Sequence, residues 1–222
     1  MGRRGESRFV RFWLAPLVLV VVAAGLAGIL FSFYNSWWVD PTRPPSSDQR
    51  AADGTTVFTS PGIEYATATG LLIIRVSDEA LDAAELGLDD DAVRTVDPEV
   101  PVEVRLLGAD GALVIELVDA VSVTTVDGAI ARVEVAPWGS GQYREYSALL
   151  ESRAETIGWT PDDLSKLESD LSAAQRASDD GTYSAQLPPR RKIGAEVTAL
   201  LSVDLDSAYT SLVIVVEPLG AG

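Results

Sequence analysis

The chain has 222 residues and a formal net charge of −16, from 33 acidic and 17 basic side chains, and it contains no histidine and no cysteine. The missing residue types exclude disulfide bonds, Ser-His-Asp and Cys-His catalysis, and histidine-ligated zinc. Chemistry based on Asp and Glu remains open, and the sequence predicts no bound cofactor.

An uncharged, apolar segment lies near the N-terminus, at residues 12–34. A helix of this length would extend roughly 34 Å, enough to cross a hydrocarbon core of about 30 Å. A secretory signal peptide has a shorter apolar run, of about 7–15 residues, with small residues directly after it. Bulky aromatic residues follow the run here. The sequence therefore predicts an uncleaved transmembrane helix, and a cleaved signal peptide is the alternative.

Aromatic and basic residues at the ends of this segment indicate its orientation. Trp13 at one end and Tyr34, Trp37 and Trp38 at the other are suited to the interface between lipid and water. Positively charged residues stay on the cytoplasmic side of a membrane, and four of them precede the apolar run: Arg3, Arg4, Arg8 and Arg11. We therefore expect a single-pass protein of the cell membrane, with residues 1–11 as a cytoplasmic tail and the C-terminal domain outside the cytoplasm.

The charge is distributed unevenly along the chain. Residues 1–11 carry four arginines and one glutamate, a formal +3, which leaves −19 for the rest. So acidic a domain repels phosphate groups, and nucleic acid is therefore excluded as a partner. Cationic partners remain open, and the alternative is that the acidity only keeps an exported domain soluble.

Small residues within the apolar segment suggest a contact in the membrane. Ala24 and Gly28 are four positions apart and therefore share one face of a helix, where small side chains allow a second helix to approach closely. This spacing predicts a homo-oligomer through the anchor, although it also arises by chance in segments rich in Ala and Gly.

A stalk and a β-rich segment follow the anchor. Proline and small polar residues at 35–56 predict an extracytoplasmic linker without an apolar period. The segment Ile63–Val76 is rich in Thr, Ile and Val, which indicates strands with a turn at Thr69-Gly70. A short helix is expected next, with Ser77 as N-cap and Gly87 at its end.

Acidic residues are densest between residues 78 and 99. Calcium binds oxygen ligands of this kind, but the spacing does not match an EF-hand loop. The competing interpretation is a solvated helix and a polar loop. The candidate calcium ligands are Asp89, Asp90, Asp91 and Asp97.

The middle of the chain gives the clearest strand signals. Strands are expected at about 101–107 and 112–118. Two more are expected around Asp127-Gly128, because Asp-Gly between alternating β-branched residues is typical of a type I′ hairpin. The apolar sets Val121, Val123 and Thr125, and Ala131, Val133 and Val135, are expected to share the core face.

A helical hairpin is predicted at about 143–180, after which the chain returns to strands at about 195–203 and 208–217. Thr160 and Pro161 indicate the start of its second helix. An apolar stripe follows, formed by Leu164, Leu167 and Leu171. The stripe predicts either a docking arm for a partner or a layer that covers the sheet.

A basic cluster follows the hairpin and contains Arg190 and Arg191. It can contact an acidic group of a partner, or it can pair with carboxylates of the same domain. The two arginines are therefore candidate partner contacts, together with the leucines of the second helix.

These elements predict an α+β protein: a single N-terminal transmembrane helix, then an antiparallel β-sandwich-like extracytoplasmic domain at 57–218 with an inserted helical hairpin, and a short tail at 219–222. The expected function is that of a non-catalytic binding or accessory module of the cell envelope. Its expected partners are the lipid bilayer, through residues 12–34, and another envelope or membrane protein. The alternative is a calcium-dependent module or an enzyme that uses carboxylates.

Overall fold

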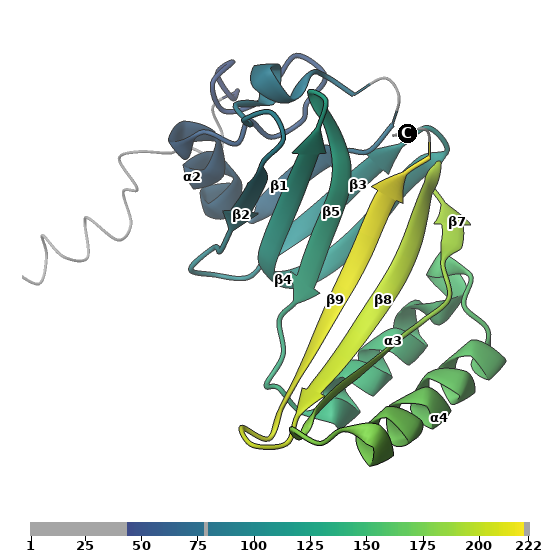
Figure 1. The fold of residues 1–222 in the computed structure, drawn as a ribbon. Helices are drawn as coiled ribbons and strands as arrows, with labels where there is room; N and C mark the ends of the chain where they lie inside the picture. The colour runs from purple at the N-terminus through teal and green to yellow at the C-terminus, as the bar shows by residue number, and fades with distance from the viewer. Residues whose placement is uncertain (1–43, 78–79, 220–222) are drawn as a thin grey trace, which may run out of the picture. The chain divides into compact units, whose positions relative to one another are not determined.

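The computed structural model of the protein describes residues 44–77 and 80–219 (Figure 1). The expected transmembrane helix at 12–34, its flanking arginines and aromatic residues, and the pair Ala24 and Gly28 lie outside the described residues. Within the described ranges, no helix has the length and hydropathy needed to cross a membrane. The anchor and its orientation therefore stay predictions.

The described residues form a mixed α+β unit with one large sheet and few helices, as the sequence predicted in its coarse outline. In chain order the elements are α2 (Ser60–Thr69), β1 (Leu71–Arg75), the 3-10 helix η1 (Ala83–Leu86), β2 (Val93–Val96), β3 (Val102–Gly108), β4 (Gly111–Val126), β5 (Ala129–Pro137), α3 (Tyr143–Ile157), α4 (Pro161–Ala177), β6 (Thr182–Gln186), β7 (Arg190–Lys192), β8 (Ala195–Asp204) and β9 (Tyr209–Pro218).

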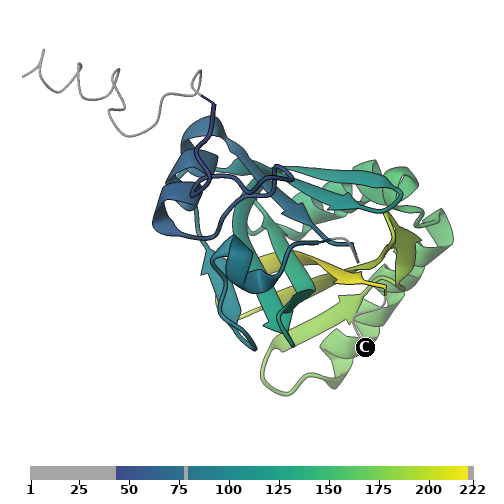
Figure 2. The same cartoon turned by 90° about the horizontal axis from the view of Figure 1, so that it is seen from above.

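The strands form one sheet in the order β1-β3-β4-β5-β9-β8-β6, with β2 paired to β4 and β7 paired to β8. The β1–β3 pair is parallel and the other pairings between these strands are antiparallel. The expected sandwich-like arrangement of two sheets is therefore not what these strands form. Figures 1 and 2 show α2 near one end of the sheet and the α3–α4 pair near the other.

The reason for the single sheet lies in β4. The sequence predicted two strands, at 112–118 and after 121, but β4 continues through both. The register of β4 shifts between Ile115 and Val118 against β3, a stretch that contains Leu117 with a φ of 54°, and between Val118 and Ala120 against β5. The first half of β4 pairs with β3 and its second half pairs with both β2 and β5. One strand thus joins two sets of neighbours that a break at this point would have separated.

The β4–β5 hairpin has the predicted turn. Asp127 and Gly128 both have positive φ, 50° and 75°, as a type I′ turn requires. Val133 and Val135 face the core as expected, but Ile130 is buried in place of Ala131. A register shift at Thr124/Thr125 changes which side chain points inward.

The segment before β1 differs from the prediction. Residues 60–69 form a helix and not a strand. Pro61 lies in its first turn and Gly70 closes it in the left-handed conformation, with φ 69°. The short helix expected after Ser77 is the 3-10 helix η1, which begins after Asp82 and ends at Gly87.

Part of the predicted linker packs against the sheet. Thr55 and Thr56 are buried, and the Thr56 amide donates to the carbonyl of Ile73 in β1 over 2.9 Å. Arg75 of β1 pairs with Asp53, also at 2.9 Å. The compact unit therefore includes residues from Pro44 onward and begins before the expected boundary at residue 57.

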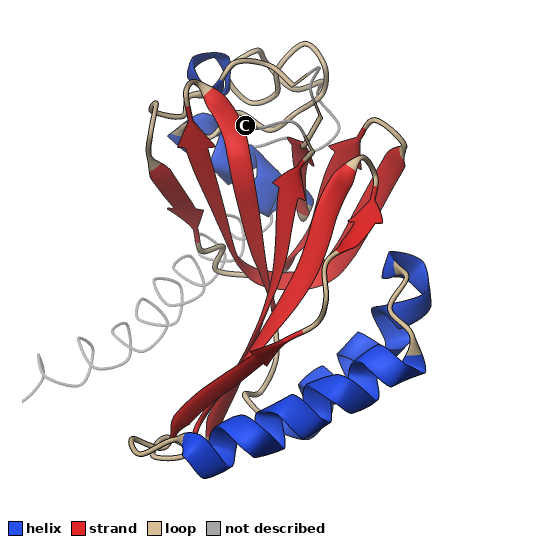
Figure 3. Cartoon of the chain, turned by 45° about the vertical axis from the view of Figure 1, so that its right-hand side comes forward, coloured by secondary structure: helices blue, strands red, loops and turns tan. Residues whose placement is uncertain are grey.

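The predicted helical hairpin is present between β5 and β6, and it packs on the sheet. Helix α3 lies beside β9, and α4 lies beside β6 (Figure 3). The buried residues of α3 are Tyr146, Leu150, Ala154 and Ile157, and those of α4 are Leu167 and Leu171. These side chains join one continuous core with the inward faces of the strands, so the hairpin is a covering layer of the domain.

Candidate functional site

An open groove lies between the two helices of the hairpin. Its main part has a volume of about 650 Å³, and a smaller hollow of about 20 Å³ adjoins it. The two parts share Glu151 of α3 and Leu164 and Glu168 of α4. We call this surface the α3–α4 groove. Its lining residues are Tyr143, Ser147, Leu150, Glu151, Ala154, Glu155, Trp159, Thr160, Pro161, Leu164, Ser165, Leu167, Glu168 and Leu201.

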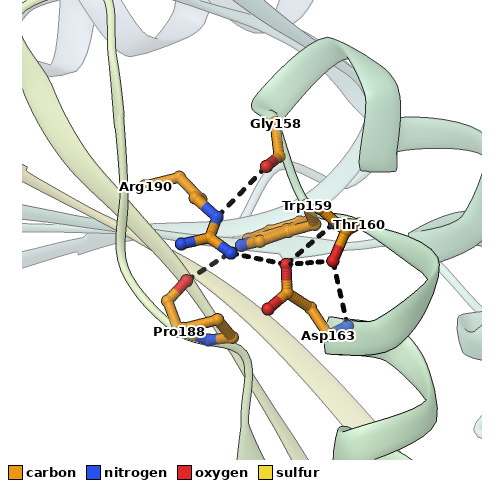
Figure 4. Close-up of polar contacts among 6 residues, drawn as sticks. All are labelled: Gly158, Trp159, Thr160, Asp163, Pro188 and Arg190. Carbon is orange, nitrogen blue, oxygen red and sulfur yellow. Dashed lines mark hydrogen bonds and ion pairs between the residues drawn. The ribbon is translucent and has the colours of Figure 1, made fainter.

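The turn between the helices fixes one end of the groove (Figure 4). Gly158 ends α3 with a left-handed φ of 100°. Trp159 is 3% exposed, and its indole Nε1 donates to the carbonyl of Pro188 over 3.0 Å. Arg190 donates through Nε to the carbonyl of Gly158 over 3.1 Å. Two side chains, one from each side of the contact, therefore hold the turn against the segment that leads into β7.

The start of α4 has a full capping box. The Thr160 amide donates to Asp163 Oδ2 over 2.8 Å, and the Asp163 amide donates to Thr160 Oγ1 over 3.2 Å. Arg190 donates to the same Oδ2 atom over 2.6 Å. These hydrogen bonds lower the pKa of the Asp163 carboxyl below its ordinary value, and the bond from the Thr160 amide has a larger effect than the bond from Arg190.

The groove combines an apolar floor with an acidic rim. Ala154 and Trp159 are buried at the floor, and Leu164 is half-buried. Glu151, Glu155 and Glu168 are exposed on the rim. Among the residues that the structure describes, none of these three glutamates forms an ion pair.

The acidic rim also affects a tyrosine in the groove. Burial raises the pKa of the Tyr143 phenol, and the negative charge of Glu168 adds to this effect. Glu151 contributes in the same direction. Carboxylates from both helices therefore act on one side chain that lines the smaller hollow of the groove.

The three leucines predicted as partner contacts have different positions. Leu167 and Leu171 are 4% and 5% exposed and pack into the core of the domain itself. Leu164 is half-buried and lines the groove. Leu167 also lines the smaller hollow of the groove, but Leu164 lines both parts and is the more exposed, so a partner in the groove would contact mainly Leu164.

The two arginines predicted as partner contacts also differ. Arg190 is engaged within the domain by Asp163 and the carbonyl of Gly158. Arg191 is exposed on the short strand β7, where it pairs in register with Glu196 of β8. Neither arginine lines the α3–α4 groove.

Two of the four acidic residues predicted as calcium ligands contact the turn of the β4–β5 hairpin through their carboxylates. Asp90 Oδ1 accepts the amide of Gly128, and Asp91 Oδ1 accepts the amide of Asp127 over 3.1 Å. Asp97 is exposed, and Asp89 lines a separate hollow of about 330 Å³ near the start of α2. In the described part of the chain, no three acidic side chains gather in a way that could hold a metal ion.

The residues that form the acidic rim and part of the apolar floor of the groove were not predicted from the sequence. Glu151 and Glu155 are four positions apart, so they share one face of α3, and this spacing was readable in the sequence. No role for Trp159 was predicted from the sequence. Nothing in the sequence indicated that Glu168 would face the same groove, because that depends on how the two helices are placed side by side.

Comparison of the chain with models of protein families, with curated proteins and with solved structures finds no match.

Proposed function

We propose that this chain is a single-pass, membrane-anchored protein of the cell envelope whose acidic extracytoplasmic domain is a non-catalytic binding or accessory module. In this proposal the α3–α4 groove is the binding surface. The single observation that carries the proposal is the groove itself, whose main part has a volume of about 650 Å³ and whose apolar floor lies beneath glutamates that form no ion pair among the described residues.

The sequence supports the location and the absence of catalysis. The uncharged segment at 12–34 and the arginines before it favour a membrane anchor with a cytoplasmic N-terminus. The absence of histidine and cysteine removes the side chains that most nucleophilic and acid–base catalysis uses. A binding module needs neither residue type.

In-cell crosslinking of the full-length chain tests this function. One version keeps residues 12–34, and a second replaces them with an unrelated membrane anchor. We expect the same partner protein to be captured by both versions, because recognition lies in the domain. Capture by the native anchor alone would place the contact in the membrane segment, and capture by neither version would contradict the binding function.

The predicted orientation needs a separate measurement. Protease added outside intact cells should degrade the domain and leave the tail at 1–11 protected. Protection of the domain from external protease would contradict an extracytoplasmic location.

A further inference from the structure

Resting on the binding function proposed above, we infer that the partner presents a cationic amphipathic helix, which lies in the α3–α4 groove as a third helix. The inference depends on the shape of the groove, on its apolar floor and on the charge of its rim.

The shape favours a helix. Helices α3 and α4 have 15 and 17 residues, so each extends roughly 22–25 Å. Figures 1 and 3 show them side by side at the same end of the sheet. A third helix of about four turns can lie along both, because helices pack at interaxial distances of about 8–10 Å. Recognition of this kind uses apolar residues at helical spacing on the inserted face.

The floor fits the apolar face of such a helix. Ala154 leaves room for a close approach, Leu164 supplies apolar surface from α4, and the buried Trp159 closes the floor at the turn between the helices. The hollow of about 650 Å³ admits several side chains, but it does not admit a whole helix. The opposite face of the bound helix therefore stays in water and has to be polar.

The rim indicates the charge of the partner. Glu151 and Glu155 lie four residues apart on α3, where like charges disfavour the helix. Glu168 lines the same groove from α4. Lysine or arginine side chains of a bound helix would neutralise all three carboxylates at once. A second copy of this acidic chain, or an anionic lipid surface, would instead be repelled.

The test uses the full-length chain in an uncharged detergent and a fluorescent synthetic helix as the probe. The probe has 16 residues, with leucines at helical spacing on one face and lysines flanking them. Binding is followed by fluorescence anisotropy, and the signal from empty micelles is subtracted. We expect saturable binding that weakens about tenfold in the double variant Glu151→Lys/Glu168→Lys.

A matched control separates this effect from the overall charge. The double variant Glu85→Lys/Glu99→Lys changes the net charge by the same amount at two exposed positions outside the groove. It should bind the probe as the unmodified chain does. A second probe with glutamates in place of the lysines should bind the groove variant better than it binds the unmodified chain.

The results also distinguish this inference from the function on which it rests. Equal weakening by the two double variants would overturn the helix-in-groove inference, as would preference of the unmodified chain for the glutamate probe. If the chain captures a partner in cells but does not bind the lysine probe, the proposed binding function stands and the inference of a cationic helix is overturned. Concentration-dependent dimers that disappear in the groove variant would assign the groove to a second copy.

Discussion

Asp163 connects three parts of the domain at the scale of a single residue. Its Oδ2 atom accepts hydrogen bonds from the amide of Thr160, from the hydroxyl of Thr160 and from Arg190. These bonds favour the ionised carboxylate, so the pKa of Asp163 in the folded state is lowered. The contribution of Asp163 to stability is therefore present above the unfolded pKa of about 3.9, and it is lost as the pH falls through the folded pKa.

We expect Asp163→Asn to have a melting temperature that depends less on pH than that of the unmodified chain when the pH falls below about 4. Thermal melts between neutral and acid pH measure this. Asp97→Asn is the control, because Asp97 is exposed and makes no side-chain hydrogen bond within the described ranges. An equal change in both variants would show that the Asp163 contacts do not contribute to acid sensitivity.

Leu117 has a strained backbone and an exposed side chain. Its φ is 54°, in the left-handed region that bulky residues rarely adopt, and its side chain is 60% exposed. We expect Leu117→Gly to raise the free energy of unfolding by about 1 kcal/mol, because glycine adopts this conformation without strain.

Denaturant unfolding measures the change at Leu117, and Leu205→Gly is the matched control. Leu205 is 51% exposed without a positive φ, so its replacement should give no gain. A lower free energy of unfolding in Leu117→Gly would contradict this prediction, because it would mean that the leucine side chain stabilises the fold by more than the backbone strain destabilises it.

At the scale of elements, the residues of α3 and α4 that stabilise the domain differ from those that the proposal assigns to binding. We expect Leu167→Ala to lower the free energy of unfolding by about 2–5 kcal/mol, because it leaves a cavity in the core. Leu164→Ala should cost far less stability, because Leu164 is only half-buried.

Denaturant unfolding of both variants gives the stability, and anisotropy with the lysine probe gives the binding. Leu164→Ala is expected to weaken binding of the lysine probe although it changes stability little, because Leu164 lines the groove. The opposite result would be that Leu164→Ala destabilises the domain as much as Leu167→Ala does and leaves binding of the probe unchanged. Leu164 would then be a core residue only.

The sequence predicted elements whose signals are local. Asp127-Gly128 and Thr160 with Pro161 each fix the conformation of a turn or a helix start through their own backbone and side chains. Helix α2 was missed because its residues resemble a strand in composition, and Gly62 shows what else decides it. A Cβ on Gly62 would lie 1.9 Å from the carbonyl oxygen of Val57, so the first turn of the helix needs glycine where it passes the chain just before it.

At the scale of the whole molecule, the sheet order and the groove could not be predicted. Both depend on which elements lie side by side. Strand β4 pairs with β2, β3 and β5 because it continues through its register shifts, and no residue type in this part of the sequence predicts that continuity. The groove needs carboxylates from two helices, and amphipathic spacing alone does not show how two helices are placed.

The net charge also belongs to this scale. The chain carries −16, and the part after the predicted anchor carries −19. A cationic partner is therefore drawn to the domain before it reaches the groove, and its capture should weaken as salt is added. In the proposed binding mode, the groove then supplies the specific contacts that net charge alone does not supply.

Site-specific photo-crosslinking in living cells is the measurement that tests the central claim most directly. A photoreactive residue replaces Ser165, which lines the groove, or Ala129, which is exposed at the tip of the β4–β5 hairpin. We predict a defined protein adduct from position 165 that disappears in Glu151→Lys/Glu168→Lys, and no such adduct from position 129. An adduct from position 129 alone, or one from position 165 that survives the charge reversal, would contradict the groove as the binding surface.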